Sequence, residues 1–176
     1  AGCGSNCTDR AARLAKIACD AGADALLAVT PYYNKASARG ILLHYRAIAE
    51  ASARPVLVYN VPARTGMTLT VQTYRELAKL DRICGVKEAS GDLELLGQLV
   101  TDCGEDLDIY TGNDTQTVSA MRLGARGVIS VVSNLLPDRM SALCRLCADG
   151  DYRRASQILQ ELRPLLRVLS AEVNPI

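Results

Sequence analysis

The segment ICGVKEA, residues 83–89, is an apolar run of strand length that carries a lysine, Lys87, near its end. Four other segments have the same character: DALLAVT (24–30), PVLVYNV (55–61), LDIYT (107–111) and GVISVV (127–132). Their nearly continuous apolar composition is typical of strands whose two faces are both covered, as in a parallel sheet lined by helices. The sequence therefore predicts five parallel strands.

Helical periodicity alternates with these strands along the whole chain. The predicted helices cover residues 8–21, 37–51, 70–80, 93–102, 115–123 and 138–169, the last of them broken near Gly150 and again near Pro164. The strand ends recur every 22 to 28 residues, at Pro31, Tyr59, Lys87, Thr111 and Ser133. A repeated strand–helix unit of this length suits either a doubly wound sheet or a (β/α)₈ barrel.

Loop composition separates these two folds. No GxGxxG or GxxxxGK[ST] loop follows any strand, which weakens the nucleotide-binding, doubly wound alternative and favours the barrel. A complete barrel has eight strands and about 250 residues. We therefore expect an α/β chain that lacks about the first three strands of a (β/α)₈ barrel. Residues 1–137 would form strands 4–8 of the barrel, and residues 138–176 would form C-terminal helices.

Composition excludes several classes of partner. Lys and Arg total 20 against 19 Asp and Glu, so the net charge is +1 and gives no reason to expect nucleic acid or an anionic membrane. No segment resembles a signal peptide or reaches the length of a membrane span. The expectation is a soluble, cytoplasmic protein.

The seven cysteines do not indicate a metal site or a disulfide framework. An odd number scattered through apolar segments is not typical of paired thiols. Cys144 and Cys147 form a CxxC motif, but they fall inside a predicted helix, where they would pack as small apolar groups. Zinc would require two more ligands, and the only histidine, His44, lies about a hundred residues away. We expect no metal and no cofactor.

Lys87 is the residue that most directly suggests chemistry. Burial in an apolar strand disfavours the charged form of a lysine and lowers its pKa. A partly neutral amine is a nucleophile toward ketones and aldehydes, with which it forms a Schiff base. The alternative is that Lys87 simply forms an ion pair with Glu88 or Asp92 at the strand end.

Other polar residues are predicted to meet Lys87 at the same end of the sheet. Tyr59 lies on the adjacent strand at a similar height, where a phenol can relay protons. Arg64 follows in the next loop and can bind a carboxylate through two parallel hydrogen bonds. Gly112 and the backbone around Ile129 can approach a small substrate closely. Together these groups indicate a site for a small α-keto acid.

The motifs TPYYN (30–34), YNVPARTG (59–66), VKEASGD (86–92) and GVISVVSN (127–134) together resemble the 4-hydroxy-tetrahydrodipicolinate synthase (dihydrodipicolinate synthase) family of pyruvate-dependent class I aldolases. The resemblance runs over essentially the whole chain. It implies a (β/α)₈ barrel that condenses pyruvate with L-aspartate 4-semialdehyde on the route to diaminopimelate and lysine. The covalent imine with pyruvate would form without a cofactor.

The resemblance also implies a role for each residue at the site. Lys87 would form the imine, Tyr59 would relay protons, Tyr33 would complete the relay in a neighbouring subunit, Arg64 would bind the carboxylate of the semialdehyde, and Gly112 and Ile129 would line the pyruvate site. A threonine that links the two tyrosines belongs to an early strand that this chain lacks. A tyrosine shared between subunits implies a homo-oligomer, commonly a dimer of dimers in this family.

Some family members are inhibited by lysine, and the matching effector residues here are Asn6 and Tyr32. Ordinary turn and interface packing explains these two residues equally well. Arg10 stands where an acidic residue often binds the effector amine, and its positive charge should repel the lysine ammonium. We therefore expect no lysine inhibition.

Two other functions fit the same residues. N-acetylneuraminate lyase and the keto-deoxy-sugar aldolases share the lysine and tyrosine, although Arg64 favours the semialdehyde as substrate. A non-catalytic barrel fragment is the third alternative, because a fold does not fix a function.

Overall fold

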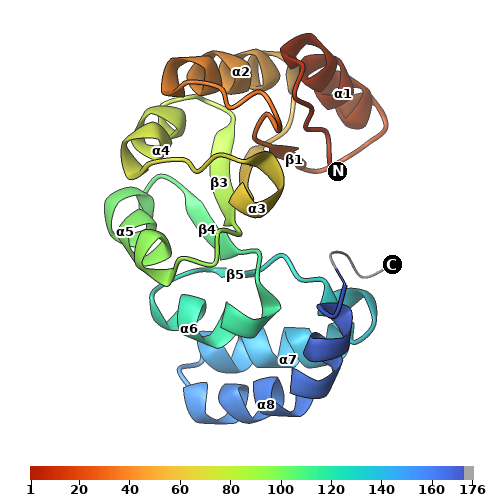
Figure 1. The fold of residues 1–176 in the computed structure, drawn as a ribbon, viewed down its shortest axis with the longest axis vertical. Coiled ribbons are helices and arrows are strands. Elements are labelled where there is room, and N and C mark those ends of the chain that lie inside the picture. Colours follow the sequence, from red (N-terminus) through yellow and green to blue (C-terminus); the bar gives the residue numbers. More distant parts are fainter. Residues whose placement is uncertain (173–176) are drawn as a thin grey trace.

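The computed structural model describes residues 1–172, and its centre is a sheet of five parallel strands (Figure 1). The strands are β1 (Leu26–Val29), β2 (Val56–Asn60), β3 (Ile83–Glu88), β4 (Asp108–Thr111) and β5 (Gly127–Val128). They pair in the order β1-β2-β3-β4-β5, every pair parallel. A doubly wound sheet would reverse its order at a switch point. The unbroken order is that of a barrel wall and confirms the predicted fold class.

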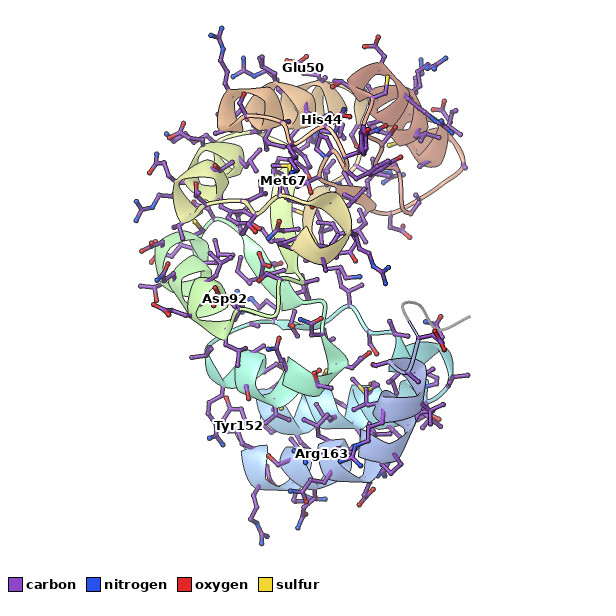
Figure 2. The ribbon with its side chains drawn as sticks, in the orientation of Figure 1. His44, Glu50, Met67, Asp92, Tyr152 and Arg163 are labelled. Atoms are coloured by element: carbon purple, nitrogen blue, oxygen red, sulfur yellow. The ribbon has the colours of Figure 1, made fainter. Side chains whose placement is uncertain are left out.

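The helices between the strands lie outside the curved sheet. They are α1 (Thr8–Asp20), α2 (Ala38–Ala51), α4 (Val71–Ala78), α5 (Leu93–Cys103) and α6 (Thr117–Arg122). Figure 1 shows them following one another around the convex side, with α2 at the top and α6 below. Capping side chains fix the starts of α2 and α5: Ser37 accepts from the Gly40 amide, and Asp92, at the start of α5 in Figure 2, accepts from the Glu94 and Leu95 amides.

The two faces of the sheet differ in burial. Side chains that point toward the helices are buried, among them Leu26, Ala28, Val56, Val58, Val86 and Ile109. Side chains that point to the concave face, such as Leu27, Leu57 and Tyr59, are only partly buried. This alternation follows the two-residue period of a strand. The main core therefore lies between the sheet and the helices α1, α2, α4 and α5.

Two further helices pack on one another beside α6. They are α7 (Pro137–Ala148) and α8 (Tyr152–Leu169), joined at Gly150, whose φ of 80° places it in the left-handed region. Figure 1 shows both below α6. Small apolar clusters join them to α6 and to the segment after β5, through Leu143 and Leu162 among others. The division of the chain at residue 138 stays a prediction. No helix within residues 1–172 is long and apolar enough to cross a membrane.

The predicted break at Pro164 is wrong, because α8 continues through this residue to Leu169. Proline removes the hydrogen bond to the carbonyl four residues earlier, that of Gln160, and its ring crowds that carbonyl. Pro164 is on the exposed side of α8, where water can reach the freed carbonyl. Leu162 and Leu166 are buried on the opposite side and hold the helix together across the proline.

The last strand is shorter than predicted. Strand β5 ends at Val128, and residues Val132–Asn134 form the 3₁₀ turn η2, so the expected strand over residues 127–132 is wrong beyond its first two residues. The amides of Val131 and Val132 donate to Oδ2 of Asp114, at 2.9 and 3.2 Å. A side-chain acceptor thus takes the place of the neighbouring strand and turns the chain out of the sheet.

A short helix, α3 (Pro62–Thr65), interrupts what the sequence predicted as a loop after β2. Pro62 occupies its first turn, where a missing amide hydrogen costs nothing. Gly66 ends the helix with a φ of 73°, a conformation that suits glycine. Arg64 lies in this helix, directly after the end of β2.

Behind the end of the sheet lies a buried carboxylate, that of Glu88, which is 2% exposed. Its two oxygens accept from Nδ2 of Asn60 at 3.0 and 2.9 Å, from the Tyr74 hydroxyl at 2.8 Å and from the Ser90 amide at 2.8 Å. Every partner is a donor, which suits an ionised carboxylate. The contact ties β2, β3, α4 and the turn after β3 together.

Replacing Tyr74→Phe should destabilise the chain because it removes one hydrogen bond from this buried carboxylate. A hydrogen bond to a charged group contributes about 1.5–3 kcal/mol, so the free energy of unfolding in urea should fall by about that amount. Tyr152→Phe is the matched control, since Tyr152 lies on α8 and packs under Arg122 through its ring rather than its hydroxyl. Equal effects of the two substitutions would contradict the assignment.

Candidate functional site

Three polar side chains meet on the concave face at the carboxyl ends of the central strands. Tyr59 of β2 pairs with Lys87 of β3, and Lys87 pairs with Tyr110 of β4. The Lys87 Nζ lies over the Tyr59 ring, 4.2 Å from its centroid. The sequence placed Tyr59 and Lys87 at the same height, and the register confirms it. Tyr110 was not predicted as a site residue, although it lies two residues before Gly112 in the segment YTGND (110–114).

Lys87 is partly buried, and this burial lowers the pKa of its amine. The carboxylate of Asp114 has a smaller effect in the opposite direction. The direction is the one predicted from the apolar strand. Because the neutral amine is the reactive form, a lowered pKa makes more of it available near neutral pH.

The alternative role for Lys87 was an ion pair with Glu88 or Asp92 at the strand end, and the described residues form no such pair. Glu88 points to the opposite face of β3, where it binds Asn60 and Tyr74. Asp92 caps the start of α5. Among the ion pairs formed by residues 1–172, none includes Lys87.

Tyr59 has a raised pKa, chiefly because half-burial disfavours the phenolate, while the positive charge of Arg64 acts in the opposite direction. The phenol thus stays protonated at neutral pH and can donate a proton. Arg64 itself is exposed, and it lies on α3 directly above the end of β2. The structure therefore brings Lys87, Tyr59 and Arg64 to one end of the sheet.

Gly112 lies directly against Lys87. A Cβ atom at this position would be 3.0 Å from Cε of Lys87 and 2.5 Å from Cβ of Ala89, so no larger residue fits without movement. The backbone of Ile129 is next to it, because the Ile129 amide donates to the Thr111 carbonyl at 3.0 Å. Both predicted lining residues thus follow the ends of β4 and β5, and Gly112 lies beside the lysine.

Asp114 is a site residue that the sequence analysis did not name. It starts the 3₁₀ turn η1 (Asp114–Gln116) and is only 8% exposed. Its Oδ2 accepts from the amides of Val131 and Val132, whereas its Oδ1 is buried and has no hydrogen-bond partner among residues 1–172. An open cavity of about 390 Å³ adjoins it, lined also by Gly112 and Arg64. The sequence signal was its position in YTGND, two residues after Gly112.

The remaining predicted residues lie apart from Lys87. Tyr33 is 88% exposed, and its φ of 73° is uncommon for a residue with a side chain. Its amide donates to the Thr65 carbonyl of α3 at 3.3 Å. Tyr32 is exposed beside it, and Nδ2 of Asn34 donates to the Asn6 carbonyl at 2.9 Å. The TPYYN loop is thereby attached to the N-terminal segment on one side and to α3 on the other.

The cysteines do not form a site with these residues. All seven are free thiols, and Cys147 is buried in the cluster that joins α6, α7 and α8. Burial raises the pKa of Cys144 and, to about 11, that of Cys147. Within residues 1–172, no three His, Cys, Asp or Glu side chains are arranged to hold a metal ion.

Comparison with known proteins relates the whole chain to one family. The Dihydrodipicolinate synthetase family matches residues 1–176. A 4-hydroxy-tetrahydrodipicolinate synthase from Methanococcoides burtonii is 45% identical over 177 residues, which cover 100% of this chain and 61% of the relative. The enzyme of the same name from Oleidesulfovibrio alaskensis is 43% identical with the same coverage.

Solved structures agree with these relatives. The 4-hydroxy-tetrahydrodipicolinate synthase of Methylacidiphilum fumariolicum SolV superposes with a TM-score of 0.96 at 42% identity, covering 99% of this chain and 59% of the other. The chloride-inhibited dihydrodipicolinate synthase of Acinetobacter baumannii, in complex with pyruvate, has a TM-score of 0.96 at 41% identity, covering 99% and 60%. This chain spans about three fifths of the length of the relatives it matches.

The lowered pKa of Lys87 predicts an unusual pH dependence of its chemical labelling. Its reaction with an amine-selective reagent should be half-maximal at a lower pH than that of lysine in a short unstructured peptide, because labelling follows the neutral amine. Peptide mass mapping over a pH series measures the midpoint for Lys87 alone, and Lys87→Arg confirms the peptide assignment. A midpoint at or above that of the free peptide would contradict the burial effect.

Proposed function

This chain belongs to the dihydrodipicolinate synthetase family, and from that premise we propose that it carries the imine-forming site of a 4-hydroxy-tetrahydrodipicolinate synthase. The reaction is the condensation of pyruvate with L-aspartate 4-semialdehyde, catalysed by a lyase of the class I aldolase type. The observation that carries the proposal is the position of Lys87, a partly buried amine without an ion-pair partner in the described chain, 4.2 Å from the ring of Tyr59.

The first steps use Lys87 and Tyr59. The neutral Lys87 amine attacks the C2 carbonyl of pyruvate, and the carbonyl oxygen takes up a proton to give a carbinolamine. Loss of that oxygen as water leaves the iminium ion. Tyr59, whose phenol stays protonated, supplies and recovers the proton in these transfers. Gly112 lies close to the lysine, and the Ile129 amide binds the carbonyl of Thr111, one residue before Gly112, so both backbones can line the site of a small keto acid.

Carbon–carbon bond formation follows from the iminium ion. Its positive nitrogen draws electrons from C3 of the bound pyruvate, so a proton leaves C3 and an enamine forms. The enamine carbon attacks the aldehyde carbon of the semialdehyde, and the aldehyde oxygen accepts a proton. We assign the carboxylate of this second substrate to Arg64, which lies in α3 directly after β2 and offers a planar pair of donors. Water then releases the product and restores the Lys87 amine.

A second subunit would complete the site. Tyr33 presents its ring to solvent while its backbone has a positive φ, a conformation that costs about 1–3 kcal/mol for a residue other than glycine. Such a side chain is better explained by a partner that receives it. We therefore propose a homo-oligomer, a dimer of dimers, in which Tyr33 extends the proton relay of the neighbouring subunit. Both substrates are small and water-soluble, which suits a cytoplasmic enzyme.

Lysine regulation is the part of the family pattern that this chain supports least. Asn6 and Tyr32 lie near each other through the contact of Asn34 with the Asn6 carbonyl. Arg10, however, is exposed on the first turns of α1, and it adds a positive charge to the region that would receive the ammonium group. We propose that the enzyme is not inhibited by lysine.

Borohydride reduction in the presence of pyruvate tests the imine. We expect a reduced pyruvyl adduct on Lys87 and on no other lysine, no adduct with Lys87→Arg, and adduct formation slowed about 10²- to 10⁴-fold with Tyr59→Phe. The experiment uses this chain alone and this chain completed with the segments of the Methanococcoides burtonii relative that lie outside the match. Absence of an adduct on the folded, completed protein would exclude the aldolase and favour a non-catalytic barrel.

Arg64→Ala should separate the two substrates. The KM for L-aspartate 4-semialdehyde should rise by about tenfold or more, since a charged hydrogen-bond pair is lost, while pyruvate trapping on Lys87 stays close to wild type. Coupled assays with the semialdehyde, N-acetylneuraminate and keto-deoxy-gluconate measure this in parallel. Cleavage of either sugar acid at a higher kcat/KM than the semialdehyde reaction would assign the chain to another aldolase.

A further inference from the structure

Asp114 has a bonding pattern that the proposed reaction leaves unexplained. It is more than nine-tenths buried, yet only one of its two carboxylate oxygens has hydrogen-bond partners in the described chain. That oxygen, Oδ2, holds the amides of Val131 and Val132. The other, Oδ1, is left without one. A buried acceptor without a hydrogen-bond partner costs free energy and is rare, so its presence calls for a functional explanation.

The position of Asp114 relates it to Lys87. The two residues belong to neighbouring segments, because β4 pairs with β3 and Asp114 follows the end of β4. Gly112, two residues earlier, lies so near the lysine that a Cβ atom there would be 3.0 Å from Cε of Lys87. Asp114 and Gly112 line the same open cavity of about 390 Å³. The carboxylate is also the charged group whose field raises the pKa of Lys87 against the effect of burial.

We propose that Asp114 is a positioning residue that acts through Lys87, as the counter-ion of the positive charge at Nζ, and that it also clamps the segment after β5. This role rests on the proposed imine chemistry. The lysine nitrogen is positive in the free ammonium form and positive again in the iminium ion. A fixed carboxylate in a partly dehydrated site stabilises both cations more than water would. Oδ2 holds the carboxylate in place, and Oδ1, which has no hydrogen-bond partner in the described chain, leaves part of its charge uncompensated.

The other charged and titratable groups around the site leave this role to Asp114. Tyr59 of β2 and Tyr110 of β4 are phenols whose pKa values are raised, chiefly by burial, so both are neutral. Arg64 of α3 is positive and would repel a positive charge at Nζ of Lys87. Glu172 lines the far side of the cavity, beyond the end of α8. Glu88 lies on the opposite face of the sheet, toward the helices, where its carboxylate accepts hydrogen bonds from Asn60 and Tyr74.

On the side of Asp114 away from Lys87, the neighbouring titratable group is Cys144 of α7. Its pKa is raised first by burial and then by the Asp114 charge, so the thiol is neutral at physiological pH. A neutral thiol carries no negative charge, so it does not compete with Asp114 as the counter-charge of Lys87.

Two substitutions separate the charge of Asp114 from its clamp. Asp114→Asn keeps an oxygen that accepts from the Val131 and Val132 amides but removes the charge. Asp114→Ala removes both. Asp108→Asn is the matched control, because it removes the same charge from the opposite, exposed end of β4, where Asp108 pairs with Arg126. Circular dichroism and thermal melting compare the folding of all three with wild type.

The first measurement is the pH midpoint of Lys87 labelling without pyruvate. Loss of a nearby negative charge destabilises the ammonium form, so the midpoint should move to lower pH in Asp114→Asn and in Asp114→Ala, and stay unchanged in Asp108→Asn. Loosened packing alone would hydrate the lysine and move the midpoint up, not down. An unchanged or raised midpoint in a folded Asp114→Asn protein would overturn the proposal.

The second measurement is borohydride trapping with pyruvate on the completed protein. Asp114→Asn should reduce the trapped fraction at sub-saturating pyruvate by roughly tenfold, the factor that corresponds to a change of one pKa unit in the stabilisation of the iminium ion. The reduction is expected even though the Lys87 amine of this variant loses its proton more readily. Wild-type trapping would contradict the counter-ion role. If pyruvate forms no adduct even with the wild-type protein, the proposed function fails, and the labelling midpoint still decides whether Asp114 is the counter-ion of Lys87.

Discussion

The buried contact between Asn60 and Glu88 is the interaction on which the arrangement of the site depends. These residues directly follow Tyr59 and Lys87 in their strands, and side chains of consecutive strand residues point to opposite faces. Each hydrogen bond to the Glu88 carboxylate behind the sheet therefore fixes the register of the amine and the phenol in front of it. A slip of one residue would exchange the two faces, burying the Lys87 amine and exposing the carboxylate.

The same sheet gives its two faces opposite electrostatic environments. Behind it, the carboxylate has donors for both oxygens and the surrounding helices exclude water. In front, Lys87 is partly dehydrated without an ion-pair partner in the described residues, and its pKa falls. A mutual ion pair would stabilise an adjacent lysine and glutamate, but consecutive side chains of a strand point to opposite faces and cannot form it. A reactive amine is the consequence, and Asp114 supplies its compensating charge from the next strand end.

Much of the fold could be predicted from the sequence, and the errors have identifiable physical causes. The five strands and the helices between them followed from periodicity, because each buries an apolar run or stripe. Pro164 did not break α8, since the residues that decide the matter, Leu162 and Leu166, are held by contacts with distant parts of the chain. Strand β5 stopped early because the side chain of Asp114, more than a dozen residues earlier, takes the amides of Val131 and Val132. Neither effect has a local signal.

The sequence by itself determined the alternation of strands and helices, the choice of Lys87 and Tyr59 as candidate nucleophile and partner phenol, and, through its motifs, the family. These are properties of local pattern and of residue type. Only the tertiary structure decided that Glu88 faces away from Lys87 and accepts hydrogen bonds from Asn60 and Tyr74. It also decided that Asp114 is buried with one carboxylate oxygen unpaired among residues 1–172. Charge environment and hydration depend on groups that are brought together from separate strands, and no single segment of the sequence contains that information.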